Sequence, residues 1–372
     1  MIPVALQLKN KKVLVIGGGK VALRKIKQFL KEEAKVYVIT IEAIEEIKQL
    51  DIHIMNKEYE KTDLQDYFLV YAATDCQDTN HSIVLDCQQM NILCGSATYE
   101  EDVGFYSMGY LEHDKGMVAL SMNQKLPYHK PLLHEMIDVL DKNNDRLDIL
   151  FALREAVLKY SDNKRAYFKR LFEIDIKVLE FINDAYKQNK GYLFIYHQSE
   201  YQEDFHFHVE PYLCLSITEY EKYHDILNIY PYIKVIPLVL VDGMILKRIQ
   251  KLAYPLYCHG AILKKEEDIK NLINILESDY HKVYFIHPRQ NKAFKDNLNK
   301  LLNNEDLYEL DEQLNLDKNE TYQFIPLLLT HGQHYHDIEK KIDDLRNKGF
   351  KIYFEGCLLD QKEIIQFIEK EL

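Results

Sequence analysis

Several features are scarce in this chain of 372 residues, and each excludes a class of protein. No apolar run approaches the roughly 20 residues that a membrane-spanning helix needs, and Met1-Ile2-Pro3 does not resemble a signal peptide, so we expect no membrane partner. The six cysteines are scattered and form no C-x-x-C pair. They predict buried thiols in a reducing cytoplasm, and neither disulfides nor a thiolate metal site.

Positive charge is also in deficit. The formal net charge of −12 argues against nucleic acid as a partner and means that an anionic substrate needs locally placed Lys and Arg. The composition, 47% hydrophobic and 28% charged, is typical of a globular chain. The length allows two domains with a helical connector.

The chain is organised around an apolar segment, residues 12–16, that runs into three glycines and then into a helix expected from Val21. A strand, a G-x-G-x-x-A loop and an amphipathic helix in this order are typical of dinucleotide-binding units. Gly17 permits the tight turn, Gly19 lets the backbone approach a pyrophosphate, and Ala22 allows close helix packing. The helix N-terminus offers free N–H groups to the phosphates. We therefore predict that this loop binds a dinucleotide cofactor, and the contacting residues are expected to be Gly17, Gly18, Gly19, Lys20, Val21 and Ala22. The alternative is an ordinary tight turn between a strand and a helix.

Further strands are expected to bring polar side chains to the same edge of a parallel sheet. Residues 35–40 predict a second strand that ends at Thr40, where the usual fingerprint has an acid that binds the ribose hydroxyls. The nearest acid is Glu42, so the choice between NAD and NADP stays open. Residues 68–73 predict another buried strand, followed by a short one at 92–94. The cofactor crevice is therefore also expected to contain Thr40, Ala73, Thr74 and Asp75, although an ordinary strand-end turn would look similar.

These segments resemble the precorrin-2 dehydrogenases, the NAD-dependent oxidase module of siroheme synthases. The resemblance is carried by residues 3–8, the glycine loop, Arg24-Lys25 and the run 72–75 with Asn80, and it continues through 105–106 and 117–121 to about residue 173. It implies that a hydride passes from the macrocycle of precorrin-2 to NAD, which gives sirohydrochlorin. The resemblance thus covers roughly the first half of the chain.

One residue of that family's pattern is missing. The family usually has an aspartate after the fourth strand, and the matching position here falls at or near Thr98. Because proton abstraction requires a carboxylate within hydrogen-bonding reach, Asp102 is the predicted catalytic residue. The alternative is that binding and NAD mainly meet the catalytic demand.

Apolar residues recur at helical spacing between residues 131 and 186. They predict a helical connector, and the resemblance implies that such helices form a homodimer and close over the tetrapyrrole. The basic residues that we expect near substrate carboxylates are Lys125, Lys130, Arg146 and Arg154.

The last part of the chain contains an internal repeat. Residues 192–197 match 283–287, each an apolar strand ending in a histidine, His197 or His287, at an offset of 90 residues. Residues 235–243 match 324–332, each ending in glycine, at an offset of 89. The nearly equal offsets predict two similar α/β halves that face each other across a cleft, with ligands at the carboxyl ends of the strands.

Histidines gather in the second copy only. His331 and His334 flank Gly332, and with His287 they form a predicted metal or proton-handling site, because neutral imidazole suits Fe, Co, Ni and Zn. This part resembles the class II chelatases, which insert metals into sirohydrochlorin and related rings. The resemblance implies that His287 and His334 accept the pyrrole protons and present Fe²⁺, the substrate metal, with Glu309 as an acidic partner. A degenerate, non-catalytic copy is the alternative.

Together these patterns predict an α/β fold in three parts. We expect an NAD-binding Rossmann-type parallel sheet at 1–113, a helical dimerisation and substrate segment at 114–187, and a duplicated chelatase-like α/β domain at 188–372. The expected function is a cytoplasmic enzyme that oxidises precorrin-2 to sirohydrochlorin and inserts iron. The alternatives are an oxidase with a C-terminal scaffold and a non-catalytic sensor that binds NAD and tetrapyrrole.

Overall fold

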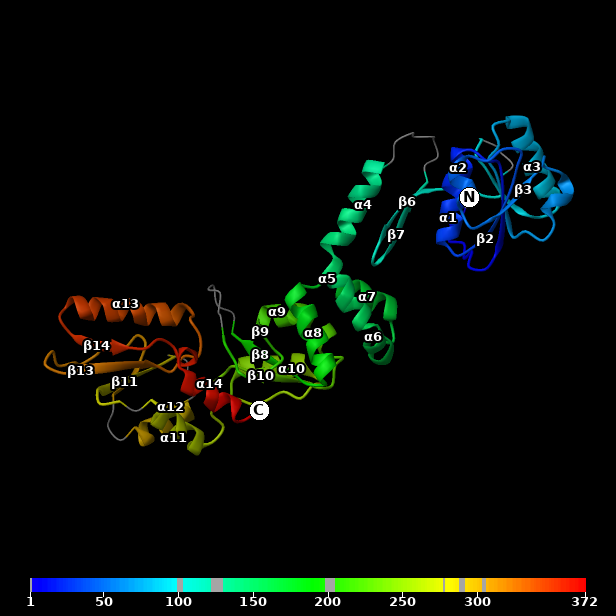
Figure 1. The fold of residues 1–372 in the computed structure, drawn as a ribbon. Helices are drawn as coiled ribbons and strands as arrows, with labels where there is room; N and C mark the ends of the chain where they lie inside the picture. Colours follow the sequence, from blue (N-terminus) through cyan, green and yellow to red (C-terminus); the bar gives the residue numbers. More distant parts are fainter. Residues whose placement is uncertain are drawn as a thin grey trace. The chain divides into compact units, whose positions relative to one another are not determined.

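The computed structural model describes residues 2–98, 103–121, 130–197, 205–276, 278–287, 292–302 and 306–372. The chain divides into two compact units, Met1–Lys142 and Asn143–Leu372 (Figure 1). Across the described ranges, every helix is too short or too polar to cross a membrane. The domain boundaries expected at residues 113 and 187 stay predictions.

The first unit is built on a five-stranded sheet whose strands are all parallel, in the order β3-β2-β1-β4-β5. This order confirms the predicted Rossmann-type sheet. The strands are β1 (Lys12–Ile16), β2 (Lys35–Thr40), β3 (His53–Asn56), β4 (Leu69–Ala72) and β5 (Leu93–Ser96). The intervening helices are α1 (Lys20–Lys31), α2 (Glu45–Lys48), the 3₁₀ turn η1 (Lys61–Leu64) and α3 (Gln77–Gln89).

Strand β1 is apolar along its length because both faces of the sheet are covered. Val13 and Val15 belong to the core that includes α1, whereas Leu14 and Ile16 belong to the core that includes α3. A parallel strand buried on both faces needs no alternation of polar residues. Strand β3 was not predicted; it lies at the edge of the sheet and is partly exposed.

An antiparallel hairpin and a helix complete the first unit. The hairpin pairs β6 (Gly109–His113) with β7 (Gly116–Leu120), and α4 (Lys130–Lys142) packs against both strands. The apolar run 117–121 therefore forms a hairpin strand outside the main sheet.

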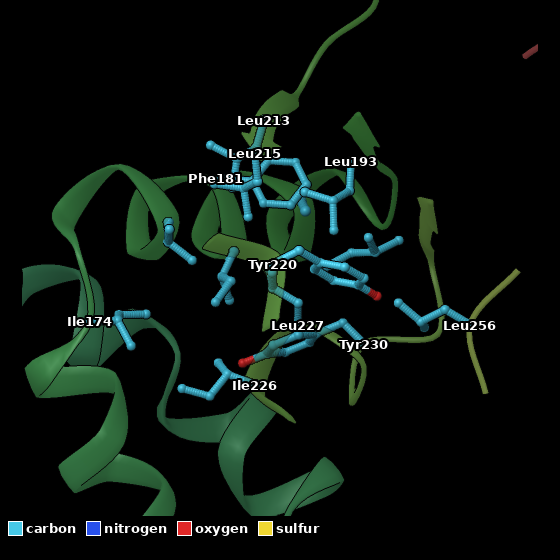
Figure 2. Close-up of a cluster of buried hydrophobic side chains, with 14 of the residues drawn as sticks. Ile174, Phe181, Leu193, Leu213, Leu215, Tyr220, Ile226, Leu227, Tyr230 and Leu256 are labelled. Carbon is cyan, nitrogen blue, oxygen red and sulfur yellow. The ribbon is translucent and has the colours of Figure 1, made fainter. Parts of the chain in front are cut away.

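The second unit begins with four helices, α5 (Asn144–Ala152), α6 (Arg154–Tyr160), α7 (Lys164–Glu173) and α8 (Ile176–Gln188). Residues of α6, α7 and α8 share a buried core with the strands that follow, as Figure 2 shows for Phe181 beside Leu213 and Leu215. In the same core, the Tyr167 hydroxyl donates to the Ile226 carbonyl at 3.2 Å. The predicted helical segment therefore packs on the first copy of the repeat through its second half.

The internal repeat is present in the structure. Sheet β9-β8-β10 of the first copy corresponds to sheet β12-β11-β13-β14 of the second. In place of a fourth strand, the first copy has a single bridge between Val235 of β10 and Cys258, which corresponds to the pairing of β13 with β14. The pairing register is the same, because Ile195 lies opposite Pro237 in one copy and Phe285 opposite Pro326 in the other. The strands are β8 (Gly191–Tyr196), β9 (Tyr212–Ser216), β10 (Ile233–Pro237), β11 (His281–Ile286), β12 (Asp306–Glu309), β13 (Thr321–Pro326) and β14 (Lys351–Phe354).

The two copies share one hydrophobic core. Phe194 of β8 and Tyr284 of β11, which are 90 positions apart, both belong to it. Residues of α11, α12 and α14 also line this core, and α9, α10 and α13 belong to the outer faces. The helices are α9 (Ile217–Leu227), α10 (Met244–Ala253), α11 (Glu266–Ile275), α12 (Lys292–Leu301), α13 (Gln333–Asn347), the 3₁₀ turn η2 (Leu358–Asp360) and α14 (Lys362–Glu369).

The cysteines correct one prediction. All six are free, and Cys87, Cys94 and Cys357 are buried as expected, but Cys214 and Cys258 are only half-buried and Cys76 is exposed. Cys76 is the N-cap residue of α3, which places it at the surface.

Candidate functional site

A cavity of about 900 Å³ in the first unit contains almost all the predicted cofactor residues. It lies where β1, β2 and β4 end, and it is lined by residues 16–21, 39–44, 57–59, 73–76, 79 and 97. Of the ten predicted cofactor residues only Ala22 is outside the lining, because it is fully buried in the core between α1 and the sheet. The volume of the cavity is within the range of small-molecule binding sites.

The three glycines differ in what surrounds them. A Cβ added at Gly17 would lie 2.2 Å from the Ala73 carbonyl oxygen, and the φ of +131° also disfavours other residues. A Cβ at Gly18 would lie 2.0 Å from the carbonyl oxygen of Glu42. A Cβ at Gly19 would meet no atom of the described residues within 4 Å. The fold therefore requires glycine at the first two positions, whereas Gly19 leaves space on the cavity side.

Helix α1 begins on the cavity lining. Gly19 is its N-cap residue and supplies no side-chain cap for the first amides. Helix N-termini carry unpaired N–H groups and a partial positive charge, which together suit a phosphate. The loop and the helix thus form a cradle that fits the pyrophosphate of a dinucleotide.

The tip of β2 has no acidic side chain at the position of Thr40. Thr40 is nearly buried, and its hydroxyl donates to the Glu42 carbonyl at 2.7 Å, so it holds the following loop against Gly18. The exposed carboxylates of Glu42 and Glu58 line this end of the cavity. The neighbouring Lys57 is paired with Asp63 at 2.8 Å.

The turn after β4 is fastened by a buried asparagine. Asn80 accepts from the backbone N–H of Thr74 at 3.0 Å and donates to its carbonyl at 3.0 Å. This pairing fixes Ala73, Thr74 and Asp75 along the cavity. The resemblance included Asn80, and the structure gives it a positioning role.

Lys25 is a buried cation behind the glycine loop. Its amino group donates to the Ser107 hydroxyl at 2.6 Å and to Gln28 at 3.1 Å, and it lies over the ring of Tyr71. Burial, with a smaller contribution from Arg24, lowers its pKa to about 8. Lys25 thereby ties α1 to the segment that follows residues 99–102.

The predicted catalytic residue Asp102 lies outside the described residues, as do Glu100, Glu101 and Lys125. Thr98, where the family's aspartate was expected, has its hydroxyl 2.9 Å from that of Ser96. Arg146 donates to the carbonyls of Phe172 and Ile174 at 3.0 and 2.8 Å. It thus closes the end of α7, a structural role that the sequence did not indicate.

In the second unit, two predicted histidines meet. The rings of His287, directly after β11, and His334, in the first turn of α13, lie 4.5 Å apart and nearly perpendicular. Glu309, the last residue of β12, is paired with Lys295 and lies beside β11, opposite Ile286. Two imidazoles and a carboxylate therefore gather at the carboxyl ends of β11, β12 and β13.

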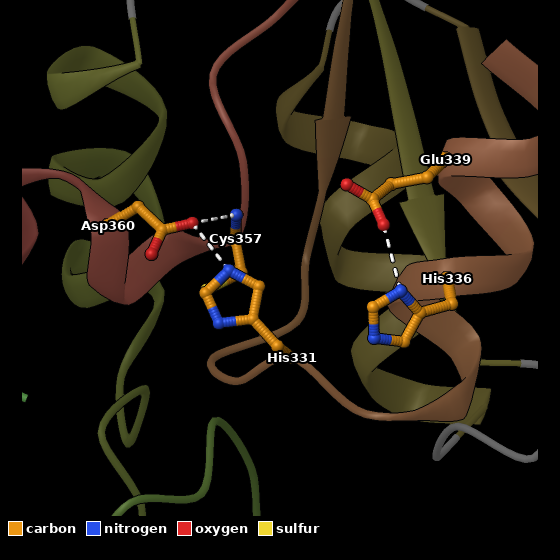
Figure 3. Close-up of polar contacts among 5 residues, drawn as sticks. All are labelled: His331, His336, Glu339, Cys357 and Asp360. Atoms are coloured by element: carbon orange, nitrogen blue, oxygen red, sulfur yellow. Dashed lines mark hydrogen bonds and ion pairs between the residues drawn. The ribbon is translucent and has the colours of Figure 1, made fainter. Parts of the chain in front are cut away.

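The third predicted histidine has different partners. His331 Nε2 lies 3.0 Å from Asp360 Oδ2 and 3.7 Å from Cys357 Sγ. Figure 3 shows the Asp360 carboxylate between the His331 ring and the Cys357 backbone nitrogen. Cys357 is fully buried, which raises the pKa of its thiol. The sequence did not reveal this cluster, because Cys357 and Asp360 are 26 and 29 residues from His331.

The parallel sheet, the glycine loop and the cavity place the first unit in the class of Rossmann-type dinucleotide-binding folds. Residues 4–108 match the family NAD_binding_7, described as "Putative NAD(P)-binding". The chain is 34% identical over 131 residues to the "Probable multifunctional siroheme biosynthesis protein HemA" of Ruminiclostridium josui, which is 34% of this chain and 25% of that protein. Further similar proteins are described as siroheme synthases, and the chain covers at most about two fifths of their length.

The matched solved structures include the following two. The precorrin-2 dehydrogenase SirC is 23% identical, with a TM-score of 0.36 over 48% of this chain and 92% of that one. The sirohydrochlorin chelatase SirB from Bacillus subtilis subspecies spizizenii, in complex with cobalt, is 16% identical, with a TM-score of 0.33 over 49% of this chain and 92% of that one.

Proposed function

We propose that this chain oxidises precorrin-2 to sirohydrochlorin with NAD and then inserts a divalent metal into the product, as steps of siroheme biosynthesis. The observation that carries the proposal is the glycine cradle at the dinucleotide-sized cavity, in a chain similar to siroheme biosynthesis proteins. The histidine pair in the second unit supports the metal step.

The proposed cofactor is NAD rather than NADP. Glu42 and Glu58 place carboxylates at the β2 end of the cavity, and the charge of Lys57 is balanced by Asp63. A carboxylate suits ribose hydroxyls, whereas the 2′-phosphate of NADP needs an unbalanced cation. NAD, when bound, supplies the hydride acceptor for the oxidation.

The residues of the first unit have three proposed tasks. Gly19 and the start of α1 hold the pyrophosphate, and Ala73, Thr74 and Asp75 line the crevice beside it. Oxidation removes a hydride and a proton from the macrocycle. We assign the proton to Asp102, because a carboxylate is the general base that Thr98 lacks.

The proposed roles in the second unit belong to His287, His334 and Glu309. The two imidazoles accept protons from the pyrrole nitrogens as Fe²⁺, the substrate metal, enters the ring. The complete set occurs in the second copy: the first copy has His197 at the position of His287, but it carries Ser216 at the end of β9 and Ile245 in the first turn of α10. We further propose that the chain has three parts: an NAD-binding part at 1–113, a middle part at 114–187 and a chelatase part at 188–372. The middle part would form the contact between the two subunits of a homodimer.

The test supplies the full-length protein with precorrin-2 and NAD under anaerobic conditions and follows the absorbance of NADH and sirohydrochlorin. We expect both to form at equal rates, and more slowly with NADP. Binding of NAD without NADH formation would contradict the proposal and indicate a sensor.

A second stage adds Fe²⁺ or Co²⁺ to sirohydrochlorin. We expect insertion by the wild type and by His336→Gln, a control on α13 whose ring pairs with Glu339 at 2.8 Å, and insertion at least 10-fold slower by His334→Gln. Equal insertion by both variants would mean that the second unit is a scaffold.

A further inference from the structure

Three side chains of different chemistry converge on one point in the second copy of the repeat. One ligand atom from each of His331, Cys357 and Asp360 lies within 4.8 Å of the others. Nε2 of His331 faces the Asp360 carboxylate (Figure 3), and the Cys357 sulfur lies beside the imidazole ring, 3.7 Å from Nε2 and 4.0 Å from Nδ1. The thiol is buried, and about one third of each of the other two side chains is exposed.

The spacing of these atoms suits a metal ion. With metal–sulfur and metal–nitrogen distances of about 2.3 and 2.0 Å and tetrahedral angles, sulfur and nitrogen donors lie about 3.5 Å apart. The Cys357 sulfur lies 3.7 Å from Nε2 and 4.0 Å from Nδ1 of His331, so a rotation of the imidazole ring would aim one nitrogen at a metal held by the sulfur. Three protein ligands with one exposed side leave a fourth position for water or another donor.

Asp360 also caps η2, because its Oδ2 accepts from the Cys357 N–H at 2.7 Å. The loop pairing on which the cluster is built does not itself require the three side chains. The loop after β13 pairs with the segment before η2 through the bond from Leu358 N–H to the Leu328 carbonyl, and the first copy makes the same bond from Ile262 to Val239, both at 2.9 Å. By this correspondence the first copy has the following residues at the three positions: Asp242 for His331, Ala261 for Cys357 and Lys264 for Asp360. The same loop pairing forms there without a ligand set.

One member of the cluster, Asp360, lies on an acidic surface. Asp360 also lines a cavity of about 800 Å³ whose charged lining contains three other carboxylates and one lysine: Asp279, Glu355, Glu363 and Lys362. Such a surface attracts cations and raises their local concentration.

We propose that His331, Cys357 and Asp360 bind a divalent metal of borderline softness, such as Co²⁺, Fe²⁺ or Zn²⁺, at a site separate from the His287–His334 pair. The mixed nitrogen, sulfur and oxygen donors favour these ions over Mg²⁺ and Ca²⁺, which prefer oxygen donors only. The site holds the metal ion until it is inserted; this role, though not the binding itself, rests on the proposed function.

The experiment titrates the metal-free full-length protein with Co²⁺ alone under anaerobic conditions. A cobalt–thiolate bond gives a sulfur-to-metal charge-transfer band in the near ultraviolet, which a hydrogen-bonded cluster cannot produce. We expect this band to saturate at one equivalent in the wild type. We expect it to be absent from Cys357→Ala, which carries the residue of the first copy, and from His331→Gln, which keeps a donor for Asp360.

Two controls separate this site from its surroundings. Cys258→Ala, in the first copy, and a double variant with His287→Ala and His334→Ala are expected to keep the band. A wild type without the band, or a Cys357→Ala protein that retains it, would overturn the proposal. Because Co²⁺ binding is measured without tetrapyrrole or NAD, failure here is distinct from failure of the precorrin-2 assay.

Discussion

Replacing Gly19 with alanine separates cofactor binding from folding, because the added methyl group would face the cavity and not the protein. A Cβ at this position meets no described atom within 4 Å, and the backbone, with φ −92° and ψ −170°, is accessible to alanine. Alanine is a poorer N-cap than glycine by about 0.5 kcal/mol. The reduced entropy of the unfolded chain offsets this by about the same amount. We therefore expect the unfolding free energy of Gly19→Ala to remain close to that of the wild type.

The cost appears in binding. A methyl group between the loop and the pyrophosphate displaces the phosphates from the N-terminus of α1, and loss of one hydrogen bond to a charged group costs about 1.5–3 kcal/mol. Since 1.4 kcal/mol corresponds to a factor of ten, the dissociation constant of NAD is expected to rise about 10- to 100-fold. Isothermal titration calorimetry gives the affinity, and urea unfolding gives the stability.

The matched control is Gly243→Ala. Gly243 is the N-cap residue of α10 in the second unit, it also has an extended backbone, and its added Cβ likewise meets no described atom within 4 Å. This variant carries the same helix-capping change but should bind NAD as the wild type does. If folded Gly19→Ala bound NAD with unchanged affinity, the cradle would not be the pyrophosphate site.

Three further predictions concern other parts of the chain. Gly17→Ala should lower the unfolding free energy by more than about 2 kcal/mol, because its Cβ would lie 2.2 Å from the Ala73 carbonyl oxygen; urea unfolding equal to wild type would exclude this reasoning. Burial lowers the pKa of Lys25 to about 8 in the folded protein, so above pH 8 the unfolded chain binds more protons than the folded protein does. The unfolding free energy of the wild type should therefore rise between pH 7.5 and 9.5 by about 1–2 kcal/mol relative to that of Lys25→Met. The exposed Lys27→Met variant serves as the control, and parallel pH dependences of wild type and Lys25→Met would contradict the assignment. His334→Gln should lose metal insertion at least 10-fold and keep the rate of NADH formation, since the histidine belongs to the second unit; a slower oxidation would refute this division.

The sequence predicted the first unit well because its signals are local. Continuous apolar strands, three adjacent glycines and an amphipathic helix specify a Rossmann-type start, and the lining of the cavity agrees with that prediction. The steric requirement for glycine at position 18 could not be predicted from the sequence. It depends on the carbonyl of Glu42, which comes close only when the β2–α2 loop folds back.

The cluster around His331 escaped prediction for a different reason. Sequence patterns for metal sites rely on ligands a few residues apart, whereas α13 and β14 separate His331 from Cys357 in the sequence. The absence of a C-x-x-C pair therefore gave no information about this cysteine. The repeat did contain a signal, because Gly260-Ala261 and Gly356-Cys357 precede the two equivalent loop pairings.

That correspondence also bears on which residues serve chemistry. Two copies of one backbone, with the same register and the same loop pairings, act as an internal comparison of what the fold needs. Both copies bury aromatic or aliphatic residues at matching positions, Phe194 and Tyr284 among them, so packing explains those. Packing does not explain His334 where the other copy has Ile245, nor Cys357 where it has Ala261. Polar residues that one copy omits without loss of the fold are the residues for which a chemical role is the simpler account.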